Sequence, residues 1–384
     1  MSPRVDRAAL TAAIKTEAAR LGFEWVGVTT PDPPPHLDVY RAWLARRRQG
    51  SMAYLAAERA VSRRADPRRI LPSCRSILVV GMRHAPPPSA DGPRLAAYAL
   101  GEDYHRVVLE RLERLMTFLQ PRAAEPFEYR LYTDTGPLLE RELAQRAGLG
   151  WIGKNTCLIH PRHGSYFLLG EALVSEPLEP DAPFVADRCG TCTRCLDACP
   201  TACILPDRTI DARRCISYQT IENRGPIPPD LRPAIGDWIF GCDVCQQVCP
   251  WNVRFAAPTP IPEFEPAPGS ASPDPRAFLE GTAPLRRSPL TRAGRNGMAR
   301  NAAVVMGHRP RAEDVEALGR ALIEHADPIV RGHAAWALGQ IGGAAAEACL
   351  RRAAKTETDS GAQKEIDAAL ASLRSSGGED PAQG

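Results

Sequence analysis

The distribution of cysteine is the sequence feature that most restricts how this chain can fold. The chain has 384 residues and 12 cysteines, and nine of these cysteines lie between Cys189 and Cys249. The other three are scattered, and an isolated free cysteine is most often a small buried apolar residue. The cysteine-rich segment must therefore fold around whatever its thiols bind.

That segment contains one complete and one incomplete copy of the same spacing. The complete copy, Cys-x2-Cys-x2-Cys-x3-Cys-Pro, runs from Cys189 to Cys199 and is the spacing of bacterial ferredoxins. The second copy runs from Cys242 to Cys249 and lacks its first cysteine, which Cys215 can replace. Because the fourth cysteine of such a run binds the other cluster, the sequence predicts two crossed [4Fe-4S] clusters. The predicted ligands are Cys189, Cys192, Cys195 and Cys249 for one cluster and Cys199, Cys215, Cys242 and Cys245 for the other.

A pair of zinc sites is the alternative interpretation of these cysteines. Zinc sites usually show separate Cys-x2-Cys pairs, and the longer run ending in Cys-Pro argues against them. Cys203 is the ninth cysteine and has no place in either cluster, so we expect it to be a small core residue.

Composition and the N-terminal sequence indicate the cellular compartment in which we expect the protein. The hydrophobic fraction is 44% and the charged fraction 24%, as in ordinary globular proteins. No segment approaches the roughly 18 apolar residues of a membrane helix, and the N-terminus lacks a signal peptide or twin-arginine signal. We therefore expect a cytoplasmic protein without structural disulfides. A net charge of +3 does not by itself indicate nucleic-acid binding.

The first 180 residues alternate between helix and strand patterns, which predicts a mixed α/β domain over residues 1–180. Expected helices are 10–21, 104–119 and 138–147, and expected strands are 23–28, 76–81, 127–132 and 167–174. Residues 181–268 form the predicted ferredoxin-like two-cluster domain, with a proline-rich extended segment at its end. The combination belongs to the α+β class.

The C-terminal part has the composition of helical repeats. Residues 298–307 and 330–339 each carry an arginine near the start, an Ala-Ala pair and an apolar-Gly ending. Such recurrence is similar to HEAT repeats, in which helix pairs stack into a solenoid. We expect HEAT-like helices over residues 285–375 and a disordered tail over residues 376–384.

Asp134 is a carboxylate that follows a predicted strand and precedes a predicted helix. It could be a helix N-cap or a functional group, and the residues alone do not decide between these. The glycine-rich turn 148–153 likewise is either a tight connection or part of a site. It follows a helix and not a strand, so it is not a dinucleotide-binding fingerprint.

Taken together, these motifs resemble the epoxyqueuosine reductases. The resemblance lies in Asp-x-x-Pro-x-x-Glu-Arg from Asp134, in Ala-Gly-Leu-Gly-Trp-Ile-Gly-Lys-Asn ending at Asn155, in Gly101–His105 and in Cys215–Glu222. The order of α/β domain, two clusters and helical repeats also matches. The sequence departs from the family pattern at residues 135 and 136, which are Thr and Gly.

The resemblance implies a tRNA-modifying reductase with a cobalamin cofactor beside the two clusters. Such an enzyme reduces epoxyqueuosine to queuosine at the tRNA wobble position, the last step of queuosine biosynthesis. By resemblance, Asp134 is the proton donor. The other positions expected to bind cobalamin, each of which could instead be structural, are Arg64, Lys154, Asn155, His160 and Ser217, together with Asp134 itself. The positions assigned to the tRNA substrate are Tyr218, Gln219, Glu222, Arg292, Arg295, Arg300 and Arg331. The first three follow a cluster ligand and could line a channel between cluster and corrin, whereas a solvated surface is the alternative for the four arginines.

Two other functions compete with this prediction. A reductive dehalogenase also uses cobalamin with two [4Fe-4S] clusters and would act on a small molecule, but it usually has an export signal and lacks helical repeats. A pure electron carrier leaves the Asp134 motif and the Gly-Trp-Ile-Gly-Lys-Asn segment without a role. We expect an external electron donor, a monomeric protein and no membrane contact.

Overall fold

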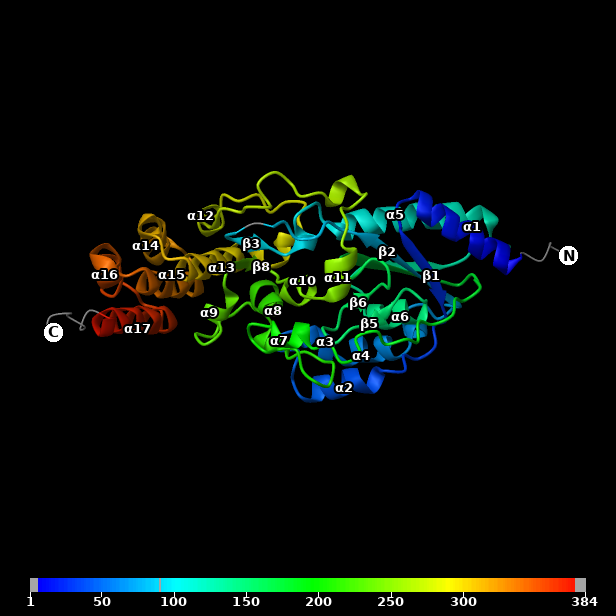
Figure 1. Cartoon of the computed structure of the whole chain (residues 1–384), viewed down its shortest axis with the longest axis horizontal. Helices are drawn as coiled ribbons and strands as arrows, with labels where there is room; N and C mark the ends of the chain where they lie inside the picture. Colours follow the sequence, from blue (N-terminus) through cyan, green and yellow to red (C-terminus); the bar gives the residue numbers. More distant parts are fainter. Residues whose placement is uncertain (1–5, 90, 377–384) are drawn as a thin grey trace. The chain divides into compact units, whose positions relative to one another are not determined.

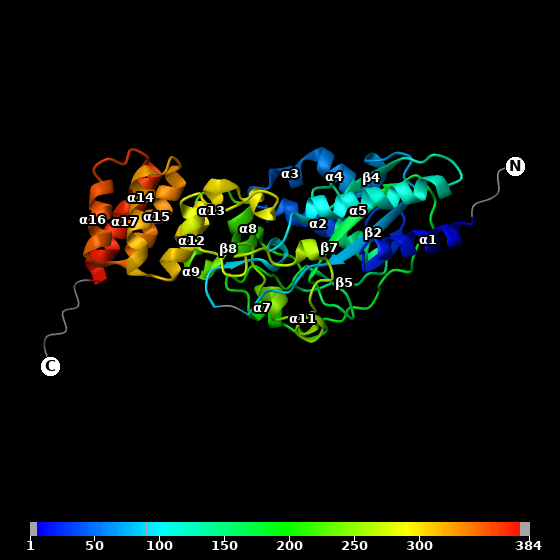
Figure 2. The same ribbon diagram turned by 90° about the horizontal axis from the view of Figure 1, so that it is seen from above.

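The computed structural model describes residues 6–89 and 91–376, and the chain forms two compact units. The first consists of Met1–Pro88, Ala97–Arg213 and Asp243–Ala267, and the second of Ser89–Ala96, Arg214–Cys242 and Pro268–Gly384. Figures 1 and 2 trace the chain through both. The cysteine-rich segment contributes residues to each unit.

A four-stranded antiparallel sheet is the centre of the first unit. Its order is β1-β2-β7-β4, so the strands adjacent in space are not adjacent in sequence. The strands are β1 (Trp25–Thr29), β2 (Ser76–Arg83), β4 (Tyr129–Tyr132) and β7 (Phe167–Val174). β1 and β4 each begin two residues later than predicted, because Phe23 and Phe127 are buried in the core outside the sheet.

Helices cover both faces of this sheet. α1 (Arg7–Arg20) and α5 (Tyr104–Leu119) pack with Leu78, Val80 and Ala172 on one face. α6 (Glu140–Arg146) packs with Ile77, Val79 and Leu173 on the other. Successive residues of β2 therefore face opposite layers, and the strand is an almost continuous apolar run because both of its faces are buried.

Smaller elements complete the first unit and carry several of the cysteines. The helices are α2 (Leu37–Ala45), α3 (Ala53–Ala56), α4 (Glu58–Ala65), α7 (Arg194–Asp197), α10 (Val244–Gln247) and α11 (Pro250–Phe255). A hairpin joins β5 (Trp151–Ile152) to β6 (Leu158–Ile159). The proline-rich segment expected to be extended contains a single 3-10 turn at Pro262–Phe264.

The second unit consists mainly of packed helices, which confirms the prediction of C-terminal repeats. Its short parallel pair is β3 (Arg94–Leu95) with β8 (Trp238–Phe240). Its helices are α8 (Ile216–Ile221), α9 (Arg232–Ile235), α12 (Pro275–Leu279), α13 (Gly294–His308), α14 (Val315–Glu324), α15 (Pro328–Ile341), α16 (Gly343–Ala353) and α17 (Ser360–Ser376). The predicted disordered tail lies outside the described residues, except for Ser376, where α17 ends.

Small residues explain how the repeat helices approach one another. A Cβ atom on Gly307 of α13 would lie 2.5 Å from the Trp336 ring of α15. A Cβ atom on Gly339 of α15 would lie 2.9 Å from Ala369 of α17. The glycine that ends each sequence repeat is therefore required by close helix packing.

Candidate active site and cysteine cavity

Asp134 lies on the loop between β4 and α6 in a conformation that few residues adopt. Its φ angle is 58°, in the left-handed region that aspartate tolerates better than most residues. Its side chain is 63% exposed. The helix that follows begins at Glu140 with Leu139 as its N-cap, so the N-cap interpretation of Asp134 is wrong.

Three contacts from neighbouring elements hold this loop. The backbone N–H of Asp134 donates to the Glu140 carboxylate. The guanidinium of Arg64, on α4, donates from Nη2 to the Gly136 carbonyl oxygen over 3.5 Å. Thr133 Oγ1 donates to the Leu169 carbonyl oxygen over 2.6 Å. Arg64 is thus buried against the Asp134 loop, which it supports from within the protein.

The start of α5 places two ring side chains beside the Asp134 carboxylate. His105 Nε2 lies 3.6 Å from Asp134 Oδ2, and its Nδ1 lies 2.7 Å from Asp103 Oδ1. Burial lowers the pKa of His105, but hydrogen bonds to the two aspartates outweigh it and raise the pKa. The Tyr104 ring stacks on His105 with centroids 4.1 Å apart. Burial and then the charge of Asp134 raise the pKa of Tyr104, whose hydroxyl donates to that carboxylate.

Two further carboxyl groups are buried below the loop. Glu171 is 0% exposed on the central strand β7, and neither of its oxygens accepts a hydrogen bond from the described residues. Burial, followed by the charge of Glu140, raises its pKa well above the ordinary value. Burial and then the charge of Asp134 raise the pKa of Glu140 to about 7. When protonated, Glu171 can donate to Glu140, so the pair holds a proton near Asp134.

Sequence reasoning did not assign roles to these neighbours, although signals were present. Tyr104 and His105 lie within one quoted motif, and Glu140 is the glutamate of the Asp-x-x-Pro-x-x-Glu-Arg motif. Glu171 is a lone acidic residue in an otherwise apolar predicted strand. A charged residue in such a position must be paired, protonated or functional.

A separate cavity of about 280 Å³ in the first unit is lined by all four cysteines predicted for one cluster. These are Cys189, Cys192, Cys195 and Cys249. Among the described residues, no group of three His, Cys, Asp or Glu side chains could hold a single metal ion. A cubane needs a wider arrangement because each thiolate binds a different iron, so the cavity fits a cluster.

Lys154 and Asn155, which we expected at cobalamin, lie at this cavity. Lys154 Nζ donates to the carbonyl oxygens of Gly190 and Cys192 over 2.8 and 2.9 Å. Asn155 Nδ2 donates to the Cys245 carbonyl oxygen over 3.4 Å. Both residues therefore stabilise the loops that carry cysteines, and their expected contact with cobalamin stays a prediction. Trp151 Nε1 also donates to Cys189 Sγ over 3.4 Å.

The other four predicted ligands are divided between the units. Cys199 and Cys245 belong to the first, and Cys215 and Cys242 to the second, so their joint cluster stays a prediction. Cys203 is buried as expected, and its Sγ atom lies 3.4 Å from that of Cys199.

His160 and Ser217 are the two remaining positions expected to bind cobalamin. The His160 ring packs 5.3 Å from Trp25 and 4.7 Å from His163. Burial, and then the charges of His163 and Arg162, lower its pKa to about 4, so its ring is neutral. Ser217 lies on α8 in the second unit. Their predicted contacts with cobalamin remain predictions.

Several predicted tRNA contacts instead hold the second unit together. Arg300 is 2% exposed and donates to the backbone carbonyls of Gln219, Asn223 and Gly225. Tyr218 and Gln219 are also buried. Because carbonyl oxygens enclose the buried Arg300 guanidinium, we withdraw Arg300 as a surface contact of tRNA. Burial is compatible with Tyr218 and Gln219 lining an internal channel, which stays a prediction.

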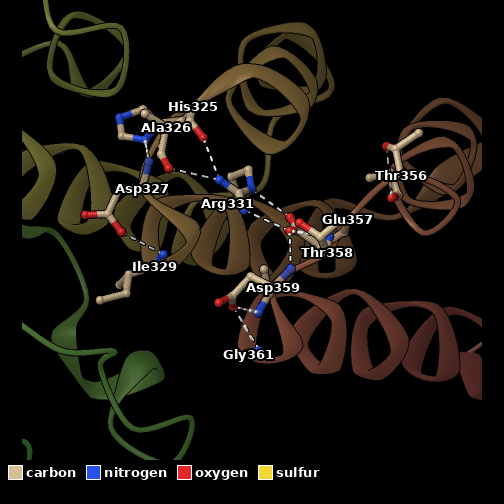
Figure 3. A network of polar contacts seen from close by, with 12 residues as sticks. His325, Ala326, Asp327, Ile329, Arg331, Thr356, Glu357, Thr358, Asp359 and Gly361 are labelled. Carbon is tan, nitrogen blue, oxygen red and sulfur yellow. Dashed lines mark hydrogen bonds and ion pairs between the residues drawn. The ribbon is translucent and has the colours of Figure 1, made fainter.

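The remaining predicted contacts differ in how firmly they are held. Arg331 forms a bidentate pair with Glu357 at 2.7 and 2.8 Å and donates to two backbone carbonyls, as Figure 3 shows. With 16% of its side chain exposed, it joins α15 to the turn before α17. Arg292 pairs with Glu222, and Arg295 donates to the Gly281 carbonyl oxygen. Arg292 and Arg295 are exposed and stay candidates.

The fold and these sites define a class, a double-cluster iron-sulfur protein with helical repeats. The family model of the 4Fe-4S double cluster binding domain matches residues 188–252, which include all eight predicted ligands, and that of HEAT repeats matches residues 290–371. A third model, described as epoxyqueuosine reductase QueG, DUF1730, matches residues 64–135. No helix among the described residues is long and apolar enough to cross a membrane.

Relatives identify the particular family. Epoxyqueuosine reductase of Xanthomonas campestris is 41% identical over 88% of this chain and 98% of its own length, and that of Escherichia coli is 38% identical over 88% and 92%. A crystal structure of epoxyqueuosine reductase with an epoxyqueuosine-modified tRNA stem loop superposes with a TM-score of 0.86, at 31% identity over 95% of this chain and 99% of that one. The chain belongs to the epoxyqueuosine reductase family. Membership confirms the predicted fold class and supports both cofactors, cobalamin and two [4Fe-4S] clusters.

Proposed function

We propose that this protein reduces the epoxide of epoxyqueuosine in tRNA to the cyclopentene of queuosine. Epoxyqueuosine reductase relatives at 38–41% identity favour this function over a dehalogenase. The observation that carries it is the Asp134 loop, an exposed carboxylate surrounded by groups that hold protons. A structure of the Bacillus subtilis epoxyqueuosine reductase is described as having its catalytic aspartate loop swung out of the active site, which supports a catalytic role for an aspartate on such a loop.

The reaction defines what the protein must supply. Removing the epoxide oxygen as water consumes two electrons and two protons and leaves a carbon-carbon double bond. When bound, cobalamin and the clusters supply the electrons, one at a time. The polypeptide must bind and orient the nucleoside and deliver the protons to the departing oxygen.

Asp134 donates the first proton from its carboxyl oxygen to the epoxide oxygen. His105, 3.6 Å from that carboxylate, carries the second proton because its raised pKa favours the imidazolium. Asp103 orients the imidazole through its 2.7 Å contact with Nδ1. Glu140 positions Asp134 by accepting its backbone N–H. Asp134, Tyr104 and His105 would face the corrin, and Arg64 would support their loop.

The remaining assignments complete the proposal. One cluster is bound by Cys189, Cys192, Cys195 and Cys249, and the other by Cys199, Cys215, Cys242 and Cys245. Electrons come from an external donor. The protein acts as a monomer on tRNA in the cytoplasm, where that substrate resides.

Analysis of tRNA nucleosides tests this function. A strain that lacks the gene should accumulate epoxyqueuosine in its tRNA, and expression of the chain should convert it to queuosine. Liquid chromatography with mass spectrometry distinguishes the two nucleosides by one oxygen atom. Unchanged queuosine in the deletion strain would contradict the proposal.

A further inference from the structure

The cavity that contains one set of cluster cysteines has an unusual charge pattern. Its lining includes Lys154, Arg188, Arg194 and Arg254, and no acidic residue. The cavity therefore joins predicted electron-carrying thiolates to a rim of positive charge.

Three of these cations are available to a partner. Arg188, Arg194 and Arg254 are exposed, and no acidic side chain within the described ranges forms an ion pair with any of them. Arg188 lies over the rings of Phe184 and Trp251, at 5.6 and 5.9 Å from their centroids. Aromatic rings thus orient the Arg188 guanidinium, which forms no ion pair with any carboxylate of the described residues.

Apolar side chains accompany this rim. Val253, between the lining residues Trp251 and Arg254 on α11, is 70% exposed. Val185 follows Phe184, whose ring stacks on Trp151, and is 88% exposed. Large apolar side chains with such exposure, next to unpaired cations, are typical of a protein-binding surface.

We propose that the surface formed by Arg188, Arg194, Arg254, Val185 and Val253 docks an acidic one-electron carrier protein, which reduces the cluster held by the adjacent cysteines. This inference rests on the proposed function, which needs two electrons from outside. One electron passes per encounter from the reduced centre of the carrier to the cluster, and two encounters supply one turnover. The positive rim attracts an acidic carrier and raises its association rate.

An RNA phosphate backbone is the other anion that this rim could bind. The exposed valines argue for a protein, because phosphate binding uses polar and charged donors and gains little from aliphatic side chains. The position also argues for a protein, because the cavity leads to thiolates and not to the Asp134 loop.

The test uses the full-length protein with both clusters and a bacterial flavodoxin in its hydroquinone form. The variant carries Arg188→Glu, Arg194→Glu and Arg254→Glu. The control carries Arg114→Glu, Arg122→Glu and Arg130→Glu, three exposed arginines of the same unit, so the net charge changes equally. Stopped-flow absorbance gives the second-order rate of cluster reduction, and calorimetry gives flavodoxin affinity without turnover.

At low ionic strength the rim variant should lose at least about tenfold in reduction rate, with weaker flavodoxin binding, and the control should change by less than about threefold. The rate should also lose most of its dependence on salt. Iron content should be unchanged, and reduction by the methyl viologen radical cation should not slow, because the reversed rim attracts this cation. Together these results exclude damage to the cluster. A variant with Arg→Gln at the same three rim positions should have a reduction rate between those of the wild type and the Arg→Glu variant.

Equal effects in the rim and control variants would overturn the proposal. So would an unchanged flavodoxin rate combined with weakened binding of a tRNA stem loop, which would assign the rim to RNA. Epoxyqueuosine reduction driven by dithionite tests the proposed function separately, because it needs no protein carrier.

Discussion

The two candidate sites of the first unit and the helix junctions of the second use charged side chains in different ways. In the first unit, Asp134 is largely exposed, Glu171 is buried without a hydrogen-bond donor from the described residues, and the arginines around the cysteine cavity have no carboxylate partner there. In the second unit, two arginines at helix junctions are held by acidic side chains. Arg331 pairs with Glu357, and Arg232 pairs with Glu365 at 2.5 Å.

This difference separates charges that act on something outside the chain from charges that stabilise the fold. A buried carboxyl group without a donor costs folding free energy, and natural proteins retain such groups where function needs them. A paired arginine near a helix junction contributes stability and specifies the packing. The predictions below test each half of this comparison.

The largest effect should come from a cluster ligand. Cys215→Ser should remove one cluster and lower the iron content from about eight atoms to about four. Cys203→Ser is the matched control and should keep about eight, because Cys203 is only a neighbour of a ligand. Iron analysis and the charge-transfer absorption measure this. A Cys215 variant with full iron content would contradict the ligand assignment.

Asp134→Asn should lower turnover by roughly 10²–10⁴, which is the contribution of a positioned general acid. Asparagine tolerates the left-handed backbone of this position, so the fold, iron content and cobalamin binding should persist. Asp38→Asn changes an exposed carboxylate on α2 and should retain activity. Single-turnover reduction of an epoxyqueuosine stem loop measures the effect, and near-normal rates would exclude a catalytic role for Asp134.

Glu357→Gln should destabilise the protein by about 2–3 kcal/mol at pH 7. The hydrogen bonds from Arg331 lower the pKa of Glu357 to about 2, despite the opposing effect of burial. A lowered carboxyl pKa stabilises the fold above the ordinary value of 4.5, and this contribution is lost as the pH falls toward 2. Denaturant unfolding of both proteins at pH 7 and pH 3 should show the difference shrinking, and a constant difference would argue against the ion pair.

Glu171→Gln should stabilise the protein at high pH, which is opposite to the effect expected for Glu357→Gln. Because burial and Glu140 raise the pKa of Glu171, ionisation of the unfolded chain makes the wild type less stable as the pH rises above about 5. The variant lacks this proton linkage, and its amide can donate to Glu140. Its stability relative to wild type should increase with pH, by at most about 1.4 kcal/mol per unit. Denaturant unfolding of both proteins from pH 5 to pH 8 measures this difference in stability. If the relative stability of the variant fell as the pH rose, Glu171 would be an ionised, paired carboxylate.

The smallest effect should come from the exposed arginines of the second unit. Arg295→Ala should weaken binding of a tRNA stem loop a few-fold and reduce the salt-dependence slope by about 1, as expected for one phosphate contact. Affinity measured at several salt concentrations tests this. If both affinity and slope match wild type, Arg295 serves only its bond to Gly281.

Local sequence patterns predicted the elements of the fold well. The helix at 104–119 and the strand at 167–174 have the predicted bounds, because an unbroken periodicity fixes which face is buried. The cysteine spacing predicted the iron-sulfur chemistry, since the geometry of a cubane is encoded in a few consecutive residues. The repeat ending in glycine predicted close helix packing for the same reason.

What only the tertiary structure decided is which side chains meet. Sequence reasoning placed Arg300 at a surface, but the backbone carbonyls of a distant segment enclose its guanidinium. It did not link Lys154 with the cysteine loops, to whose carbonyl oxygens its ammonium group donates. Glu171, His105 and the motif that contains Asp134 and Glu140 come from three separate parts of the chain, and no local pattern links all three. Pairing of charges depends on contacts between residues far apart in the chain, so the sequence alone determined the elements and the cluster motif, and only the folded chain determined which charges are paired.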